Sequence, residues 1–299
     1  MILCCGEALI DMLPRTTQAG EDCYMPDPGG AVHNTAVALG RLGADVGFVS
    51  GISTDFFGQM LMEKLEGSGV NTADVVRADR PTTMAYVKLT NGHATYVFYD
   101  ENTAGRMLEP EDMPHTRADA YFFGGISLVV DPCGAAYAAM MQRVAPDAIT
   151  MIDPNIRPGF ITDEAAYRAR ISAMLKVANI VKTSDEDLDW IGGGVEGLLE
   201  DTATSVVLLT KGSEGVTIIT REGQWDVPAQ KATVVDTVGA GDTFNAGFLA
   251  GLDQAGFLTK STFPDVTEQA LHAAATLGAK AAAVTVSRAG VNPPWAREL

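Results

Sequence analysis

The sequence predicts an α/β protein with three layers, in which a mainly parallel central sheet lies between helices and a small second sheet forms a lid. Two observations support this fold class. From about residue 105 onward, short apolar runs typical of buried strands alternate with helical patterns, which predicts right-handed crossovers and a parallel sheet. Within the first hundred residues, by contrast, there are two hairpin patterns, and hairpins do not belong inside a parallel sheet. We expect the whole chain, 1–299, to form one domain.

The first part of the chain supplies the first strands, two helices and the lid. A buried strand over 2–5 ends at Gly6, and three prolines within 12–28 exclude a long helix there and indicate a short strand pair. Gly29 and Gly30 open an Ala-rich helix that ends at Gly43. A strand over 46–52 and a helix over 55–66 follow. The alternating runs 82–89 and 95–99 flank Asn91-Gly92, which predicts a hairpin, so 12–28 and 82–99 together form the lid.

The remainder of the chain alternates regularly. We expect strands over 120–123, 148–152, 180–182 and 205–210, and helices over 131–144, 163–175 and 184–191. A hairpin of 216–220 and 224–227 indicates an antiparallel sheet edge. The β-branched run 233–235 reads as a strand, and it is followed by a glycine turn, a helix over 243–252 and a last Ala-rich helix over 264–286.

Composition excludes several classes of function. The net charge of −17 argues against nucleic acid, whose phosphates require basic contacts. No apolar run reaches the length of a membrane span, and the N-terminus lacks the pattern of a signal peptide. The four cysteines form no Cys-x-x-Cys pair and the four histidines no metal-ligand pair, so we expect reduced thiols, a cytoplasmic protein and no protein-held zinc.

The most informative stretch is Val234-Val235-Asp236-Thr237-Val238-Gly239-Ala240-Gly241-Asp242-Thr243-Phe244. A glycine turn at the start of a helix presents unpaired backbone N–H groups and the positive end of the helix dipole, and both suit an anion. Asp242 is unexpected beside a bound anion. It is either a helix-capping acid or a general base that deprotonates a hydroxyl, and spacing alone does not decide between the two.

Other polar groups follow strand ends. Asp11 comes soon after the first strand, where open α/β sheets place ligand groups, although a turn acid is the alternative. Arg157 follows the strand 148–152, and its forked donors could hold a phosphate or a sugar acid if it is not simply a surface residue. For His33 we expect a buried, hydrogen-bonded side chain, with a ligand role as the alternative.

The run from Asp236 to Asp242 resembles the C-terminal signature of the ribokinase-like (phosphofructokinase-B type) carbohydrate kinases, and the run from Gly29 to Gly43 resembles their N-terminal signature. The resemblance covers nearly the whole chain and implies the ribokinase-like fold with its β-lid. It also implies that Asp242 is the general base and that the amides of Gly239, Ala240 and Gly241 form an anion hole. A Walker loop is absent, so this turn would have to handle the phosphate.

The resemblance further implies a set of binding residues. The sugar would contact Asp11, Gly29, Gly30, Asn34, Asn102, Arg157 and Asp242. The nucleotide would contact Lys182, Thr210, Gly212, Gly239 and Gly241, with the segment 275–290 bordering the adenine. Many members carry Asn-x-x-Glu to organise Mg²⁺, whereas this chain has Ser184 and Asp187, so Asp187 becomes the expected Mg²⁺ contact. Carbonyls near Asp236, Val238 and Arg288 would hold a monovalent cation such as K⁺.

These features predict an ATP-dependent sugar kinase that uses Mg²⁺. The runs 153–157 and 99–104 resemble the fructokinase branch, which favours fructose as the substrate. The alternatives are a kinase for 2-keto-3-deoxygluconate or for another sugar or nucleoside, and a sugar-binding regulator that has lost catalysis. A dinucleotide oxidoreductase is disfavoured because no G-x-G-x-x-G follows the first strand. Dimerisation through the lid is a further expectation from the resemblance.

Overall fold

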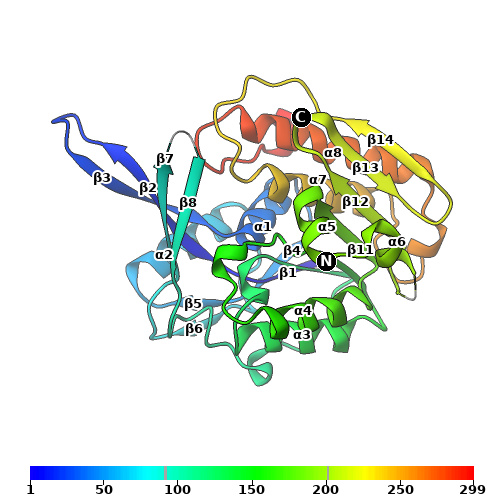
Figure 1. The fold of residues 1–299 in the computed structure, drawn as a ribbon, viewed down its shortest axis with the longest axis horizontal. Helices are drawn as coiled ribbons and strands as arrows, with labels where there is room; N and C mark the ends of the chain where they lie inside the picture. Colours follow the sequence, from blue (N-terminus) through cyan, green and yellow to red (C-terminus); the bar gives the residue numbers. More distant parts are fainter. Residues whose placement is uncertain (91–92, 201) are drawn as a thin grey trace.

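The computed structural model of the protein describes residues 1–90, 93–200 and 202–299. Figure 1 shows a broad α/β body from which a smaller group of strands projects to one side. Among the described residues, the large sheet has the order β14-β13-β12-β11-β10-β9-β1-β4. Strands β1, β4, β9, β10, β11 and β12 pair in parallel, and β13 and β14 add an antiparallel edge. The predicted fold class is confirmed.

The strands of the large sheet are β1 (Ile2–Cys5), β4 (Val46–Val49), β9 (Ala120–Gly124), β10 (Ile149–Asp153), β11 (Ile180–Ser184), β12 (Val206–Thr210), β13 (Gly215–Ile219) and β14 (Gln224–Pro228). The helices are α1 (Ala31–Arg41), α2 (Phe56–Gly67), α3 (Cys133–Val144), α4 (Glu164–Leu175), α5 (Asp185–Ile191), α6 (Gly194–Leu199), α7 (Ala240–Gln254) and α8 (Glu268–Val286). Short 3₁₀ turns are η1 (Pro110–Asp112), η2 (Ile126–Leu128), η3 (Pro158–Phe160), η4 (Gly212–Glu214), η5 (Phe263–Asp265) and η6 (Ala296–Glu298).

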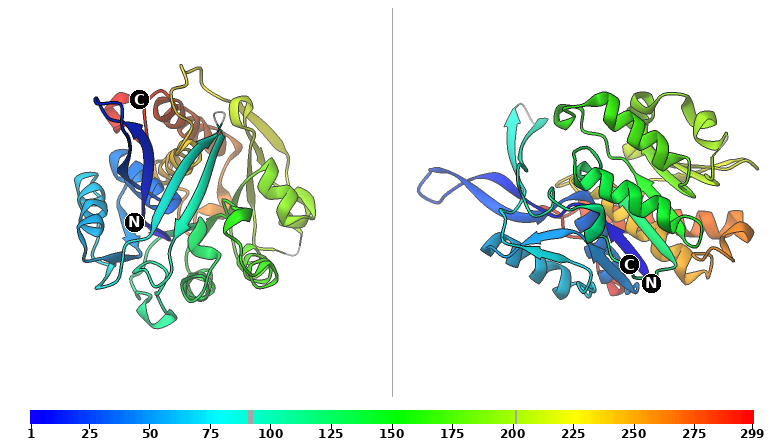
Figure 2. Two further views of the ribbon diagram at one scale, coloured as in Figure 1. Left: turned by 60° about the vertical axis from the view of Figure 1, so that its left-hand side comes forward. Right: turned by 90° about the horizontal axis from the view of Figure 1, so that it is seen from below.

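Two apolar cores, one on each face of the large sheet, hold the layers together. Side chains alternate across the sheet, so Ile2 and Cys4 of β1 enter one core while Leu3 and Cys5 enter the other. Helices α1, α2, α7 and α8 cover the first face, and α3 and α4 cover the second (Figure 2). Within the described part of the chain, no helix is both long enough and apolar enough to cross a membrane.

The small sheet is the predicted lid. It has the order β3-β2-β7-β8 and consists of β2 (Leu9–Thr16), β3 (Asp22–Gly29), β7 (Met84–Thr90) and β8 (His93–Tyr99). These strands stand apart from the main body on the left of Figure 1. The predicted turn at Asn91-Gly92 lies outside the described residues. A separate parallel pair, β5 (Gly51–Ser53) with β6 (Val76–Ala78), replaces the second half of the strand expected over 46–52.

The strand predicted from the β-branched run 233–235 is wrong. Val234 and Val235 are about 60% exposed, and they lie in an irregular segment that leads to α7. The amides of Val235 and Asp236 donate to the carbonyl of Val286 at the end of α8, at 2.8 and 3.2 Å, and not to a neighbouring strand. β14 already forms that edge of the sheet. The valines therefore have no strand to pair with, despite their high β propensity.

Candidate active site

A cavity of about 370 Å³ lies between the lid and the carboxyl edge of the parallel strands, where α/β sheets bind ligands. We call it the lid cavity. The lid contributes an apolar wall that includes Leu9, Tyr96 and Phe98. The main body contributes polar groups, namely Glu7, Asn34, Asn155, Arg157, Lys182, Ser184, Asp187 and Asp242. Predicted residues from distant parts of the chain therefore line one site.

A second cavity of about 600 Å³, which we call the α7–α8 cleft, adjoins the first. Its lining is mostly small and apolar, with Phe244 of α7 and three alanines of α8 opposite Thr210 and Gly212. Thr237, Ala240 and Gly241 belong to the walls of both cavities. The glycine turn singled out from the sequence is therefore the place where the two cavities meet.

The geometry of this turn explains its glycines. Gly239 precedes the first turn of α7 with a φ of 77°, a left-handed conformation that L side chains rarely adopt. A Cβ at Gly239 would also lie 2.7 Å from Cγ1 of Val291. The first N–H groups of α7 have no partner within the helix, as an anion site requires. The amide of Ala240 is partly engaged, because it donates to the carbonyl of Thr237 at 3.3 Å.

Asp242 lies in the first turn of α7 and is 7% exposed. Its Oδ2 accepts a hydrogen bond from Nδ2 of Asn34 at 2.9 Å, so helix α1 orients the carboxylate. Burial raises the pKa of Asp242 to about 7, with Asp153 adding to the rise while Asn34 and Lys182 oppose it. A carboxylate with a pKa near 7 that lines a cavity is suited to proton abstraction.

Asp11 faces the same cavity from the lid. It follows the first strand, as expected, but it lies within β2 of the small sheet, because the lid begins at Leu9 and not at about residue 12. Burial, and then the negative charges of Asp27 and Asp242, raise its pKa to about 7. Gly29 of β3 lies beside it, and a Cβ at Gly29 would collide with Oδ2 of Asp11. Gly29 thus makes room for this carboxylate and does not itself line the cavity.

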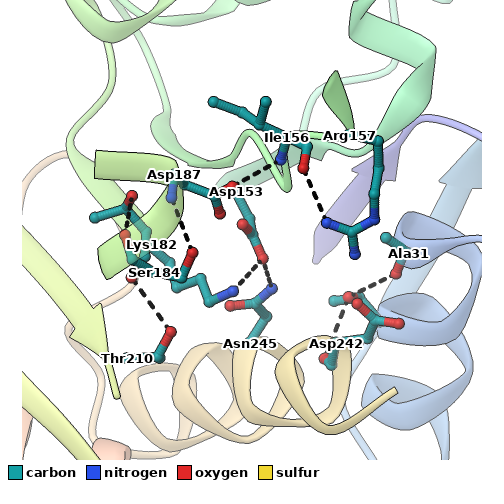
Figure 3. A network of polar contacts seen from close by, with 12 residues as sticks. Ala31, Asp153, Ile156, Arg157, Lys182, Ser184, Asp187, Thr210, Asp242 and Asn245 are labelled. Carbon is teal, nitrogen blue, oxygen red and sulfur yellow. Dashed lines mark hydrogen bonds and ion pairs between the residues drawn. The ribbon is translucent and has the colours of Figure 1, made fainter. Parts of the chain in front are cut away.

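A buried polar cluster lies below the glycine turn. Nζ of Lys182, on β11, is 2.9 Å from Oδ2 of Asp153 at the end of β10, and the two residues are 6% and 2% exposed. Nδ2 of Asn245, on α7, donates to the same Oδ2 at 2.7 Å (Figure 3). Sequence reasoning assigned Lys182 to the nucleotide but missed Asp153 and Asn245. Asp153 could have been found from its place at a strand end, whereas Asn245 gave no signal.

Asp187 and Arg157 both form hydrogen bonds with the backbone of Ile156, in the loop that follows β10. Oδ1 of Asp187 accepts from the amide of Ile156 at 3.0 Å, and burial raises the pKa of this carboxyl. The Ser184 hydroxyl accepts from the amide of Asp187 at 3.1 Å and caps α5. The guanidinium of Arg157 donates to the carbonyl of Ile156 at 3.1 Å and points toward the cavity in Figure 3.

The structure does not bring every predicted residue to a cavity. Asn102 has a φ of 59° in the turn after β8, where its Oδ1 accepts from the Arg80 guanidinium, and it does not line the lid cavity. In the predicted cation region, the Asp236 carboxylate accepts from the amides of Val238 at 3.0 Å and of Gly290 at 3.2 Å. That contact joins the start of the glycine turn to the segment after α8.

Glu7 is a cavity residue that sequence reasoning missed. It is 7% exposed, and its carboxylate accepts from the amide of Ala31 at 3.0 Å and from that of Ser127 at 3.3 Å. It thereby links the start of α1 to the loop after β9. Burial raises its pKa despite these hydrogen bonds. Its place directly after the Gly6 that closes the first strand was the available signal.

His33 is buried, as expected. The prediction that its ring is hydrogen-bonded is wrong as far as the described residues go. Neither ring nitrogen has a partner among those residues, and the ring lies edge-on to Phe48 with centroids 6.1 Å apart. Burial lowers its pKa to about 4, so the ring is neutral at physiological pH. His33 is not among the residues that line either cavity.

A buried carboxylate in the first turn of a helix, next to the wall that two adjoining cavities share, is an arrangement that suits transfer of a phosphoryl group between two small molecules. The family described as "pfkB family carbohydrate kinase" matches residues 1–297, and the chain belongs to this family.

Relatives and solved structures agree with this assignment. A fructokinase of Rhizobium leguminosarum bv. trifolii is 50% identical over 278 residues, which cover 91% of this chain and 85% of the relative. A fructokinase of Salmonella typhimurium is 31% identical, covering 98% of this chain and 96% of the relative. The crystal structure of a Xylella fastidiosa fructokinase with bound ATP is similar with a TM-score of 0.90 at 29% identity, over 97% of this chain and 93% of that one.

Proposed function

We propose that the chain, acting as one kinase domain over 1–299, is an ATP-dependent fructokinase. The observation that carries this proposal is the junction at Thr237, Ala240 and Gly241, where the lid cavity and the α7–α8 cleft share a wall. A sugar in the first cavity and a nucleotide in the second would meet there, beside Asp242. The similarity to fructokinases, one of them 50% identical, supports fructose as the acceptor.

The lid cavity offers groups that suit a sugar. Asp11 and Asn34 lie on different walls and can pair with hydroxyl groups, while Tyr96 and Phe98 present rings to the apolar face of the sugar. Gly30, with a φ of 100°, allows the backbone to approach closely because it has no side chain. The predicted contact of Asn102 is not supported by its position, since it pairs with Arg80 away from this cavity.

The α7–α8 cleft suits a nucleotide. The alanines of α8 give the cleft an apolar wall against which a purine can pack, and Gly212 and Thr210 line the same cleft as the glycine turn. The first amides of α7 would then receive the terminal phosphate. The presence of Ala279, Ala282 and Ala283 in this wall supports our proposal that segment 275–290 borders the adenine.

The proposed reaction is one in-line transfer. Asp242 takes the proton of the sugar hydroxyl, the hydroxyl oxygen bonds to the γ-phosphorus, and the bond from that phosphorus to the β–γ bridging oxygen breaks, releasing ADP. The backbone N–H groups of Gly241 and its neighbours stabilise the charge on the transferring group. Asn34 keeps the carboxylate oriented, because it donates to Oδ2.

Asp187 is the side chain that fits Mg²⁺. Oδ1 is engaged with the amide of Ile156, and the carboxylate lines the lid cavity near the phosphate path. Mg²⁺ in kinases commonly uses one or two carboxylates together with waters and phosphate oxygens, so a larger cage is not needed. When bound, the ion would neutralise phosphate charge. For a monovalent cation such as K⁺, the carbonyls around Asp236 and Val238 remain our proposal.

The decisive test is a panel of sugars assayed with ATP and Mg²⁺ by coupled ADP release. We expect fructose to give the highest kcat/KM, and Asp242→Asn to remove turnover while fructose binding, measured by calorimetry, persists. A preference for 2-keto-3-deoxygluconate would refute fructose and favour the second candidate, for which Arg157 at the cavity is a ready partner for the acid group. Fructose binding without any ADP release would favour a regulator.

We also propose that two copies associate through their lids. Tyr24, Met25, Val97 and Tyr99 of the small sheet are 43–61% exposed, and such apolar surface is typical of a contact site. Sedimentation velocity of the wild-type protein and of a Tyr24→Ser/Tyr99→Ser variant tests this, since a dimer that survives the substitutions would exclude this face.

Finally, we propose a cytoplasmic location. All four cysteines, Cys4, Cys5, Cys23 and Cys133, are free thiols in the structure, and three of them are buried. Free thiols are typical of reducing compartments. Fractionation of the native host would test the location directly.

A further inference from the structure

Glu7 is a buried carboxylate of the lid cavity to which the proposed reaction gives no role. It is 7% exposed, and no basic side chain in the described part of the chain forms an ion pair with it. A buried charge without a counter-ion costs free energy, because the charge loses its hydration. The role of Glu7 must therefore lie in the hydrogen bonds that its oxygen atoms accept.

Glu7 caps helix α1 from outside the helix. Its Oε1 accepts from the amide of Ala31, the first residue of α1, at 3.0 Å, and its carbonyl oxygen accepts from the amide of His33 at 3.2 Å. Gly30, which precedes the helix, has no side chain for this task, and the first turn of α1 contains no acid. Glu7 thus satisfies two N–H groups of the first turn, and its negative charge lies at the positive end of the helix dipole.

The same carboxylate reaches a second segment of the chain. Its Oε2 accepts from the amide of Ser127, in η2, at 3.3 Å. Gly125, with a φ of 70°, makes room for this contact, because a Cβ there would collide with both carboxylate oxygens. Ile126 of the same turn lines the lid cavity, as Ala31 does. One side chain therefore joins two walls of the cavity that are far apart in the sequence.

The start of α1 also holds the proposed base in place. Nδ2 of Asn34 donates to Oδ2 of Asp242 at 2.9 Å, and the hydroxyl of Thr35 donates to the backbone carbonyl of Asp242 at 3.2 Å. Asn34 and Thr35 lie within about one helical turn of Ala31, whose amide Glu7 binds. A displacement of the start of α1 would therefore move the carboxylate that is to receive the proton.

We propose that Glu7 is a positioning residue of the phosphoryl transfer: by binding the amides of Ala31 and Ser127, its carboxylate fixes helix α1, and with it the hydrogen bond by which Asn34 directs Asp242 toward the sugar hydroxyl. The inference rests on the proposed kinase function. Such positioning matters for the rate, because a displacement of about 1 Å in a reacting group can cost about a hundredfold. Glu7 acts through α1 and exchanges no proton with the substrate.

A double-mutant cycle between Glu7 and Asn34 tests this role. Glu7→Gln keeps the volume of the side chain but leaves only one oxygen to accept, so one of the two amides loses its partner. We expect kcat to fall at least about tenfold, while the KM for the sugar changes less than about threefold. In an Asn34→Ala background, where the hydrogen bond to the base is already absent, the same change should lower kcat by less than about twofold.

The cycle can contradict the proposal in three ways. An unchanged kcat in Glu7→Gln would show that the contact has no effect on the reaction. A loss of equal size in both backgrounds would show that Glu7 does not act through Asn34. A rise of more than about tenfold in the KM at unchanged kcat would show that Glu7 contacts the sugar directly. The assay uses the sugar that wild type turns over fastest, so a preference for a sugar other than fructose leaves the comparison intact.

The matched control is Asp55→Asn. Asp55 has the same arrangement at α2, since Oδ1 accepts from the amide of Gly58 at 2.7 Å and Oδ2 accepts from that of Thr82, in a distant loop, at 3.0 Å. It lines neither the lid cavity nor the α7–α8 cleft. This variant should lower the thermal midpoint but keep kcat within about twofold of wild type. If it loses as much kcat as Glu7→Gln does, the effect is a general loosening of the fold and the proposal is wrong.

A crystal structure of Glu7→Gln supplies a readout that needs no turnover. We expect the hydrogen bond between Asn34 and Asp242, at 2.9 Å in the wild-type protein, to be broken, with one of the two side chains in another rotamer. An intact hydrogen bond in the variant would overturn the positioning role. If the wild-type protein transfers no phosphate to any sugar, the kinase proposal fails, and this structure still decides whether Glu7 holds Asn34 against Asp242.

Discussion

Replacing the proposed base should make the protein more stable as well as inactive. In Asp242→Asn the hydrogen bond from Asn34 can persist, because an amide oxygen replaces the carboxylate oxygen that accepts it. Burial raises the pKa of Asp242 from 3.8 to about 7, so ionising this carboxyl in the folded protein costs about 4 kcal/mol more than in the unfolded chain. The asparagine avoids that cost.

The pH dependence of this gain has a definite sign. Because the folded-state pKa is raised, the folded protein binds more protons than the unfolded chain between about pH 4 and 7, and wild-type stability falls as pH rises through that range. Asparagine does not titrate. We therefore expect the variant to be more stable than wild type by up to about 4 kcal/mol at pH 8, and by roughly half of that at pH 5.5.

Urea unfolding of both proteins at pH 8 and pH 5.5, with kcat measured on the same samples, checks this prediction. The expected fall in kcat is at least about a hundredfold. The control is Asp253→Asn, the same substitution at an exposed position near the end of the same helix, which should change neither quantity. A stability difference between wild type and Asp242→Asn that does not vary with pH would refute the claim that this carboxyl is buried and costly to ionise.

Three other outcomes follow from the same geometry. The kcat/KM for fructose should fall as pH drops below about 7, since Asp242 and Asp11 act as carboxylates and both pKa values are raised to about 7; a flat profile from pH 5.5 to 8 would contradict this. Gly241→Ala should lower kcat by about ten- to a hundredfold at nearly unchanged thermal midpoint, because the methyl group crowds the flexible end of Lys182 and screens the anion site. Gly29→Ala should raise the KM for fructose more than it lowers kcat, since it displaces Asp11; steady-state kinetics with an unaltered KM would show that Gly29 has another role.

Patterns that depend on local chemistry were predictable. The alternation of strands and helices gave the parallel sheet, and the hairpin patterns near the N-terminus gave the lid. The glycine turn was located because Gly239 must adopt a positive φ, a requirement visible in the residue type itself. The two family signatures then identified Asp242 and Asn34, which the structure joins by a hydrogen bond.

The wrong predictions concern segments whose place depends on contacts with distant parts of the chain. The valines at 234 and 235 have strand propensity, but β14 occupies the sheet edge and their segment bonds to the end of α8. The lid was expected to begin at about residue 12 and begins at Leu9, so that Asp11 belongs to it, because nothing local shows how soon after the first strand the chain enters the lid. Asn102 follows the lid strands in sequence, yet its turn faces Arg80 and not the cavity.

The sequence by itself determined the layered fold, the lid, the glycine turn before α7 and the family to which the kinase belongs, because each depends on residue types at short, fixed spacings. Only the tertiary structure decided that Lys182, Asp153 and Asn245 form one buried cluster, and that Asp242 has a pKa near 7. The burial of these residues depends on the packing of α7 against β10 and β11, and Asn245 lies 92 residues from Asp153 in the sequence. No local sequence pattern shows that two residues so far apart will be in contact.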